Sequence, residues 1–317
     1  MRKLESNPKI LRRPVHGVLL LDKPLGLSSN NALQKCKWLL RAQKAGHTGT
    51  LDPLATGVLP LCFGAATKFS QLQLDADKTY EATIRLGVKT STGDAEGEVI
   101  QERPVPPIAA ARLDEVARQF TGALRQLPPM HSALKKDGKP LYEYARAGQE
   151  VEREVRDVIV RSLQLALVPG KSDQVKLLAT VSKGTYIRTL GEDIAQALGC
   201  GGHVIALRRL ATGNFEISQC TTLEALEAMS DDDRLKRLAP VDALLPGHSH
   251  VTLDEENAGR FLSGLRRRGD WPDNEQVAVL GPCGKSLLGT AHIKGGELIP
   301  GRLLSPVEIE QILESKT

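Results

Sequence analysis

Two segments of the chain alternate apolar and polar residues in the manner of strands that bury one face. The apolar positions of the first, residues 79–86, are Tyr80, Ala82, Ile84 and Leu86. Those of the second are Val175, Leu177, Ala179 and Val181, and Gly184 follows where this strand should end. Both segments predict half-buried antiparallel strands.

Two other segments have the periodicity of helices. Residues 28–40 follow a short apolar strand at 16–21 and begin with Ser28 and Ser29, either of which can cap a helix. The apolar positions on one face of that helix are Ala32, Leu33, Cys36, Leu39 and Leu40. Residues 189–198 predict a second helix that ends at Gly199. Strands and helices do not alternate as in a doubly wound sheet, so we predict an α+β fold with a mixed, largely antiparallel sheet.

The length of the chain indicates more than one domain. Its 317 residues exceed the roughly 250–300 that a single core usually organises. The composition changes near residues 240–250, after the acidic run at 231–233. Beyond that point the chain is rich in glycine and has β-like stretches at 276–280 and 287–292. We predict a large domain over residues 1–247 and a small β-rich domain over residues 248–317.

Positive charge is concentrated at the start of the chain. Residues 1–50 contain ten Lys or Arg against two acidic residues, whereas the whole chain carries a net charge of only +4. This distribution favours a polyanionic partner, although a solvated basic surface would have the same composition.

Composition argues against several other classes of protein. The five cysteines are odd in number and form no Cys-x-x-Cys pair, which disfavours a disulfide framework and a zinc knuckle. The half-motif of Cys200 and His203 is only a weak sign of metal. No apolar run approaches the roughly 18 residues of a membrane span, and no secretory signal follows the basic N-terminus. We therefore expect a soluble, cytoplasmic protein.

The densest motif is residues 46–57, Gly-His-Thr-Gly-Thr-Leu-Asp-Pro-Leu-Ala-Thr-Gly. Its glycines, proline and hydroxyl residues predict a constrained loop rather than a helix or strand. Asp52 could be a turn residue or a rigidly held nucleophile or base. Arg188 lies where the second strand should turn into a helix, and it could depress the pKa of Asp52 through two parallel hydrogen bonds. A surface charge at a helix end is the alternative for Arg188.

Other catalytic motifs are absent from the sequence. There is no P-loop, no Gly-x-Ser-x-Gly and no Gly-x-Gly-x-x-Gly after the first strand, which disfavours a nucleotide-dependent enzyme, a serine hydrolase and a nicotinamide enzyme. Tyr80 and Tyr186 could provide stacking platforms for bases, with core packing as the default alternative.

Six ordered motifs resemble the bacterial TruB family of tRNA pseudouridine synthases. They are residues 21–30, 46–57, 78–87, 128–146, 183–190 and 202–209. The departures are Thr50, where alanine is common, and Asn31 and Ser91, where aspartate is common; Ser91 leaves part of the RNA docking open. The resemblance implies a pseudouridine synthase fold, a tRNA-gripping insertion at about 124–150 and a PUA-like RNA-binding domain over residues 248–317.

The resemblance also implies the activity, which is conversion of uridine 55 in the T-loop of tRNA to pseudouridine after the base is flipped out of its stack. Help with tRNA folding could coexist with catalysis. No atom enters or leaves overall, so we expect no cofactor and no metal. The implied catalytic residues are Asp52 as the essential carboxylate, Arg188 as the group that keeps it ionised, and Tyr80 as a stacking ring that assists loss of the C5 proton.

The resemblance assigns substrate binding to six more residues. Tyr186 and Leu207 are expected to line the uracil pocket, and His47 to occupy the space that the flipped base leaves. Lys23 and Lys68 are expected to contact phosphates. Asp94 retains the second acid of the 91–94 segment and is grouped with them. The implied partner is the T-arm of tRNA, with no membrane, no obligate protein partner and a monomeric chain.

Three alternatives remain at this stage. Archaeal and eukaryotic relatives that work with guide RNA share the catalytic motifs, and the insertion at 128–146 favours the stand-alone bacterial type. An RNA-binding or RNA-folding module would use Asp52 only structurally. A glycosidase would need a second carboxylate across the cleft, and no motif supplies one.

Overall fold

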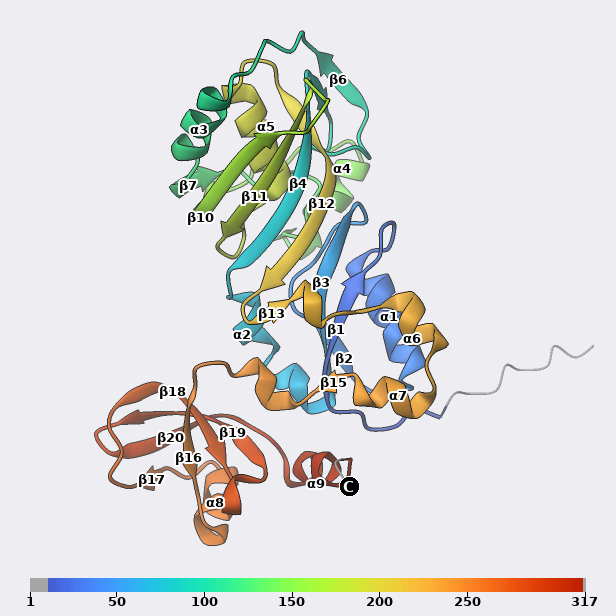
Figure 1. The fold of residues 1–317 in the computed structure, drawn as a ribbon. Helices are drawn as coiled ribbons and strands as arrows, with labels where there is room; N and C mark the ends of the chain where they lie inside the picture. Colours follow the sequence, from blue (N-terminus) through green and yellow to red (C-terminus); the bar gives the residue numbers. More distant parts are fainter. Residues whose placement is uncertain (1–10, 316–317) are drawn as a thin grey trace, which may run out of the picture.

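The computed structural model describes residues 11–315, and its strands are dominated by one large sheet that runs through the long axis of the molecule (Figure 1). In order across this sheet the strands are β14 (Thr221–Thr222), β1 (Gly17–Lys23), β3 (Ala55–Phe63), β12 (Gly202–Thr212), β4 (Lys78–Leu86), β11 (Gln174–Val181), β10 (Arg156–Leu167) and β7 (Gly122–Gln126). Three short strands pair beside them, β13 (Phe215–Glu216) on β12, β15 (Leu238–Ala239) on β1 and β2 (Ala45–His47) on β3.

The sheet is mixed and largely antiparallel, as predicted. Only β12 with β3 and β1 with β14 pair in parallel among the large-sheet strands of residues 11–315. The alternation in the sequence identified β4 and β11 correctly, because Tyr80, Ile84, Leu177 and Val181 are all buried in the main core. β4 and β11 pair directly, and β12 lies on the other side of β4.

Helices cover the sheet and fill its edges. They are α1 (Ser29–Leu39), α2 (Ser70–Leu74), α3 (Ala110–Gln119), α4 (Leu141–Arg146), α5 (Ile187–Ala197), α6 (Leu223–Ala228) and α7 (Asp231–Lys236), with 3-10 turns η1 (Gly64–Lys68), η2 (Ile217–Gln219) and η3 (Val241–Leu244). Ser28 caps α1 by accepting the Asn31 N–H at 3.1 Å, which settles the choice between the two serines. α5 begins at Ile187, two residues earlier than predicted, so Arg188 lies in its first turn.

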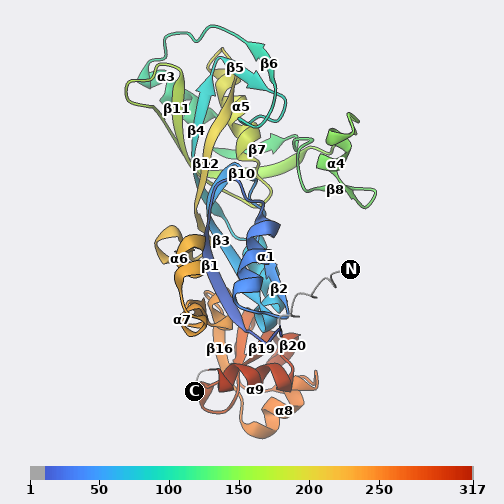
Figure 2. The same cartoon turned by 90° about the vertical axis from the view of Figure 1, so that its right-hand side faces the viewer.

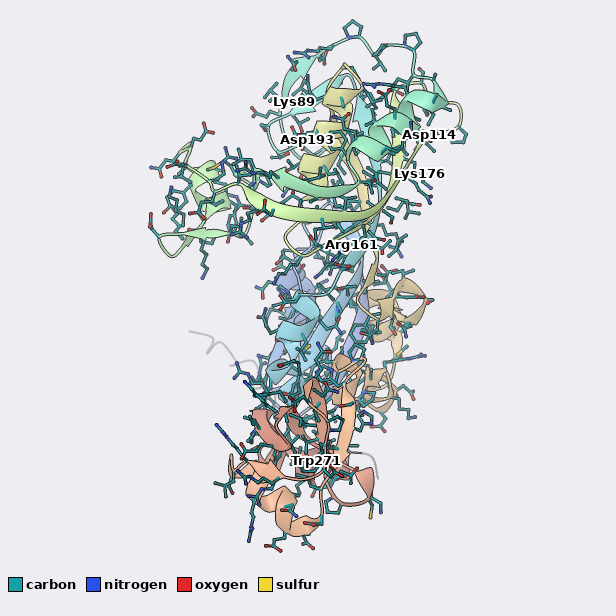
Figure 3. The ribbon with its side chains drawn as sticks, turned by 90° about the vertical axis from the view of Figure 1, so that its left-hand side faces the viewer. Lys89, Asp114, Arg161, Lys176, Asp193 and Trp271 are labelled. Atoms are coloured by element: carbon teal, nitrogen blue, oxygen red, sulfur yellow. The ribbon has the colours of Figure 1, made fainter. Side chains whose placement is uncertain are left out.

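Two small hairpins extend from the large sheet. One consists of β5 (Val88–Thr90) and β6 (Val99–Glu102), and the other of β8 (Lys135–Lys136) and β9 (Lys139–Pro140). The second hairpin and α4 stand away from the sheet between β7 and β10 (Figures 2 and 3). This arm lies within the region expected to be an insertion, residues 124–150.

The C-terminal region forms a separate five-stranded sheet, which confirms the expected β-rich character. Its strands, in order, are β16 (Ser249–Thr252), β18 (Asn274–Leu280), β19 (Leu287–Lys294), β20 (Glu297–Leu303) and β17 (Arg267–Arg268), accompanied by α8 (Glu255–Leu262), α9 (Pro306–Glu314) and the turn η4 (Pro282–Gly284). This sheet has a core of its own around Phe261 and Val277. A further apolar cluster joins it to the large sheet, with Val18 and Phe69 on one side and Ala278 and Leu304 on the other.

No helix within residues 11–315 is long and apolar enough to cross a membrane. The basic residues at positions 1–10, part of the predicted basic segment, lie outside the described residues.

Gly57 allows β3 to pass against β12. It has φ of +103°, and a Cβ at this position would lie 2.1 Å from the Arg209 carbonyl oxygen. We expect Gly57→Ala to lower the free energy of unfolding by about 3 kcal/mol or more, because steric overlap adds to left-handed strain. Denaturant unfolding measures the loss. Gly199→Ala is the control, since φ is +95° there but no neighbour lies within 4 Å; only about 1–2 kcal/mol should be lost. Equal losses at the two positions would contradict the steric argument.

Candidate functional site

Asp52 lies on a short loop between β2 and β3. The predicted loop over 46–57 is too long, because the structure places its first two residues in β2 and its last three in β3. The Ser29 hydroxyl accepts the Leu51 N–H at 2.7 Å and donates to the Leu51 carbonyl at 3.0 Å. The Gly26 N–H donates to the Pro53 carbonyl at 2.8 Å. The start of α1 and the turn before it therefore hold the residues on both sides of Asp52.

Arg188 points from α5 toward this loop and is 5% exposed. Its Nε lies 3.0 Å from Asp52 Oδ2, and its Nη1 lies 3.2 Å from Asp94 Oδ2. Nη1 also donates to the Thr92 carbonyl at 3.0 Å, and Nη2 donates to the His131 carbonyl at 2.7 Å. The structure thus brings Asp52 and Arg188 together, but through one contact rather than the two parallel hydrogen bonds expected from the sequence.

The pKa of Asp52 is raised rather than depressed, which corrects the expectation from the sequence. Burial is the largest cause, and the Arg188 guanidinium only partly offsets it. The Asp94 carboxylate nearby raises the pKa of Asp52 further, and the Lys23 ammonium lowers it. Sharing one guanidinium between two carboxylates weakens its effect on each of them.

This pKa shift predicts a dependence of stability on pH. Since the pKa of Asp52 is raised on folding, protonation favours the folded chain, and this contribution is lost as the pH rises through the raised pKa. Asp52→Asn is neutral at every pH, so we expect it to melt at a higher temperature than the wild type at neutral pH. The difference should disappear at acidic pH, where Asp52 itself is neutral. Thermal unfolding of both proteins across this pH range measures the difference. If the variant were less stable than the wild type at neutral pH, the ion pair with Arg188 would stabilise the fold by more than burial of the charged carboxylate destabilises it.

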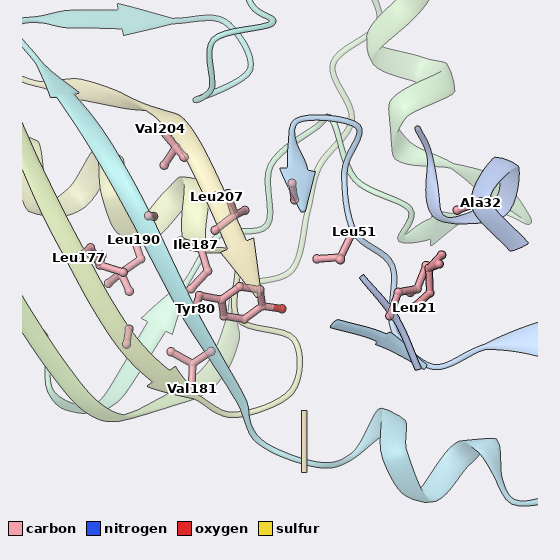
Figure 4. Packing of buried hydrophobic residues seen from close by; sticks show 14 of the residues in the cluster. Leu21, Ala32, Leu51, Tyr80, Leu177, Val181, Ile187, Leu190, Val204 and Leu207 are labelled. Atoms are coloured by element: carbon pink, nitrogen blue, oxygen red, sulfur yellow. The ribbon is translucent and has the colours of Figure 1, made fainter. Parts of the chain in front are cut away.

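A cavity of about 390 Å³ opens beside Asp52 and Arg188. Tyr80, Leu207, Ile187 and Val181 form part of its apolar lining, and Figure 4 shows the other three side chains near the Tyr80 ring. Ligand pockets span roughly 300–1,000 Å³, so the volume suits a small ligand such as a nucleobase. An apolar ring beside an open space is the arrangement that stacking of a base requires. Tyr186 also lines this cavity, so Tyr80, Tyr186 and Leu207 lie together as the sequence suggested.

A second cavity, of about 500 Å³, is also lined by Asp52 and Arg188. The residues that line both cavities are Thr50, Leu51, Asp52, Ser132, Ala133 and Arg188. His47 lines only the second cavity, together with Tyr142 and Arg146 from α4. Burial lowers the pKa of His47, and the Arg209 guanidinium lowers it further. His47 thus lies at the second cavity and not at the first, and its lowered pKa favours the neutral imidazole.

Asp94 is a nearly buried carboxylate in the wall of the second cavity, beside Arg188. It is 2% exposed, and its Oδ1 accepts the Thr92 hydroxyl at 2.5 Å and the Glu96 N–H at 3.0 Å. Its Oδ2 faces Arg188. These contacts hold the Arg188 guanidinium, and Asp94 also lines the second cavity, so its grouping with the substrate-binding residues stays a prediction.

Both lysines expected to contact phosphate are engaged with protein groups in this structure. Lys23 is fully buried, and its ammonium donates to the Pro24 and Leu27 carbonyls at 3.0 and 2.5 Å. Burial lowers its pKa to about 8. The Lys68 ammonium lies 2.6 Å from Glu308 Oε2 in α9 and donates to the Leu303 carbonyl at 2.9 Å. Lys23 therefore supports the turn before α1, and Lys68 joins the large sheet to the C-terminal region.

Two buried cations beneath the first cavity were not identified from the sequence. Arg209 donates from Nε to the Val58 carbonyl at 2.6 Å and from Nη2 to the Gly49 carbonyl at 3.3 Å. The Lys78 ammonium donates to carbonyls at the end of α2, and burial lowers its pKa to about 8. Strand alternation offered a signal for Arg209, because it shares the face of β12 that carries Leu207.

Comparisons with known proteins show the family of the chain. Residues 37–187 match the TruB family pseudouridylate synthase N-terminal domain, and residues 188–246 match the tRNA pseudouridylate synthase B C-terminal domain. The tRNA pseudouridine synthase B of Verminephrobacter eiseniae (strain EF01-2) is 62% identical, covering 98% of this chain and 95% of the relative. That of Ralstonia nicotianae (strain ATCC BAA-1114 / GMI1000) is 58% identical, covering 92% and 95%.

Solved structures show the same fold at low identity. A Cbf5–Nop10–Gar1 complex contains a chain with a TM-score of 0.69 and 23% identity, covering 97% of this chain and 93% of that chain. An H/ACA RNP bound to a substrate RNA containing 2′-deoxyuridine gives a TM-score of 0.67 and 21% identity, covering 96% and 92%. The fold and the family matches define a pseudouridine synthase, which is an isomerase. Within that class the chain belongs to the TruB family.

Proposed function

We propose that this chain isomerises one uridine in the T-loop of tRNA, uridine 55, to pseudouridine, with Asp52 as the essential carboxylate. The observation that carries the proposal is the Asp52–Arg188 ion pair at the edge of a base-sized cavity that contains Tyr80. The curated relatives named above are tRNA pseudouridine synthases, which supports tRNA as the substrate.

The reaction breaks the bond between N1 of uracil and C1′ of the ribose, turns the base and joins C5 to C1′. The proton on C5 leaves to solvent, and one proton returns to N1, so atoms balance without a cofactor or metal. Flipping the uridine costs a few kcal/mol, and stacking on Tyr80 returns roughly 1–3 kcal/mol. Leu207 packs beside this ring, while Arg188 orients the carboxylate at the point where the two cavities meet.

Three parts of the chain are assigned to holding the RNA. We assign residues 1–247 to the catalytic domain, about 124–150 within it to a tRNA-gripping insertion, and 248–317 to a PUA-like RNA-binding domain. Arg146 lies 5.2 Å from the centre of the Tyr142 ring, and both side chains line the second cavity, which supports RNA contact by the insertion. His47, also at the second cavity, is assigned to the space that the flipped uridine leaves. The substrate places the enzyme in the cytoplasm, where it acts as a monomer.

The test of this function uses the purified chain alone with an unmodified tRNA transcript. We expect nucleoside analysis to find one pseudouridine per tRNA, formed without guide RNA or a protein partner. Activity only with an added guide RNA would favour the guide-dependent relatives. Tight tRNA binding without any product would leave an RNA-binding protein in which Asp52 is structural.

A further inference from the structure

Ser132 lies at the junction of the two cavities but has no place in the mechanism above. It belongs to the segment between β7 and β8, and it lines both cavities together with Asp52 and Arg188. A side chain at this position faces the flipped nucleoside if the base enters the first cavity.

The backbone around Ser132 is fixed by the catalytic pair and by α4. The carbonyl of the preceding His131 accepts Arg188 Nη2 at 2.7 Å. The Ser132 N–H donates to the Met130 carbonyl at 3.0 Å, and the Ser132 carbonyl accepts the Tyr142 N–H at 3.1 Å. The hydroxyl is therefore held in place relative to Arg188, as a substrate-positioning group needs to be.

The hydroxyl of Ser132 is buried and unused. The residue is 5% exposed, and its Oγ has no hydrogen-bond partner among residues 11–315. The Tyr186 hydroxyl competes for it, because hydrogen bonding by Ser132 partly offsets the rise that burial causes in the pKa of Tyr186, although this contact does not reach hydrogen-bond geometry in the structure. A buried hydroxyl without a hydrogen-bond partner destabilises the folded chain. Its presence indicates that a bound ligand supplies the missing hydrogen bond.

The three cations that line the first cavity already donate to protein acceptors, and Arg209 does so through Nε and Nη2 to the Val58 and Gly49 carbonyls. Arg188 binds two carboxylates and two carbonyls, and the Lys78 ammonium donates to carbonyls at the end of α2. A uracil that enters this cavity would bury two carbonyl oxygens, each of which needs a donor. Ser132 is placed to supply one.

Resting on the function proposed above, we propose that the Ser132 hydroxyl donates a hydrogen bond to a carbonyl oxygen of the flipped uracil and thereby positions the base against Asp52. The residue acts on the substrate directly, and the insertion that carries it couples tRNA binding to base positioning.

The test combines Ser132→Ala with tRNAs that carry uridine, 2-thiouridine or 4-thiouridine at the target position. We expect the variant to lose roughly tenfold in kcat/KM on ordinary tRNA, the effect of one hydrogen bond. Sulfur is a poor acceptor, so one thio-substitution should slow the wild type and slow the variant no further. Ser70→Ala is the matched control, because it removes a serine hydroxyl that donates to the Thr67 carbonyl at 3.0 Å, outside the insertion and outside both cavities.

Two results would overturn the proposal. One is an unchanged kcat/KM in Ser132→Ala, and the other is a variant whose loss simply multiplies with both thio-substitutions, which would make Ser132 structural. Ser132→Cys, which keeps the volume and is a weaker donor, should lie between the wild type and the alanine variant if the latter folds poorly. Failure of the proposed function itself is distinct, because the wild type would then form no pseudouridine from ordinary tRNA.

Discussion

Asp52→Asn is expected to stop pseudouridine formation while leaving tRNA binding nearly intact. The amide has the size of the carboxylate but cannot act as a nucleophile or base, so turnover should fall by at least about a thousandfold. Binding should persist because one partly exposed side chain contributes little to an interface made of many phosphate contacts. Single-turnover kinetics and a tRNA binding titration on the same preparation measure the two effects.

The binding measurement distinguishes loss of catalysis from loss of folding. A variant that lost activity, binding and folding together would show that Asp52 is a turn residue of its loop. Asp22→Asn is a useful comparison, since Asp22 pairs with Arg208 at 2.7 Å and lines neither cavity. It should retain turnover.

Arg188→Met is expected to remove activity and to destabilise the chain. Asp94 would remain buried without its guanidinium, and breaking a buried pair from one side costs about 3–5 kcal/mol. The carbonyls of Thr92 and His131 would also lose their donor. Denaturant unfolding should therefore show a lower free energy of unfolding, alongside loss of turnover at temperatures where the variant is folded.

Two further variants test whether the loss of stability comes from the buried position of Arg188 and its pairing with Asp94. Arg161→Met removes an ion pair with Asp77 at 3.1 Å on the exposed side of β10 (Figure 3), and it should cost less than about 1 kcal/mol. Combining Arg188→Met with Asp94→Asn should recover part of the lost stability but none of the activity. A single Arg188 variant as stable as Arg161→Met would contradict the buried network.

Much of the fold could be predicted because the informative elements are amphipathic. The alternation in β4 and β11 and the periodicity of α1 follow from burial of one face, which a sequence records directly. The start of α5 was misplaced by two residues because Tyr186, the residue before the helix, makes no side-chain cap for the sequence to display.

The sequence indicated which residues belong to the site, but it did not indicate which of them contact one another. Asp52 and Arg188 stand out because each lies in a segment rich in glycine and hydroxyl residues, yet the distance between them depends on how the β2–β3 loop meets the start of α5. Burial was the quantity that sequence reasoning missed. It makes Lys23 a support of the turn before α1 rather than a phosphate ligand, and it raises the pKa of Asp52 despite the adjacent arginine.

The burial of the Asp94 side chain was also not predictable from the sequence. A lone acid in a hairpin loop is expected at the surface, whereas this one is enclosed by Thr92, Glu96 and Arg188. Three partners from two segments cannot be read from spacing along the chain, because they exist only after β5, β6 and α5 have packed together.

Tritium release from tRNA labelled at C5 of its uridines tests the central claim most directly, because the C5 proton leaves only when the base is rejoined through carbon. We expect the wild type to release one equivalent per tRNA without guide RNA, and none from a transcript whose uridine 55 is replaced by cytidine. Release that continues after this replacement, or no release despite tight binding, would contradict a site-specific uridine isomerase.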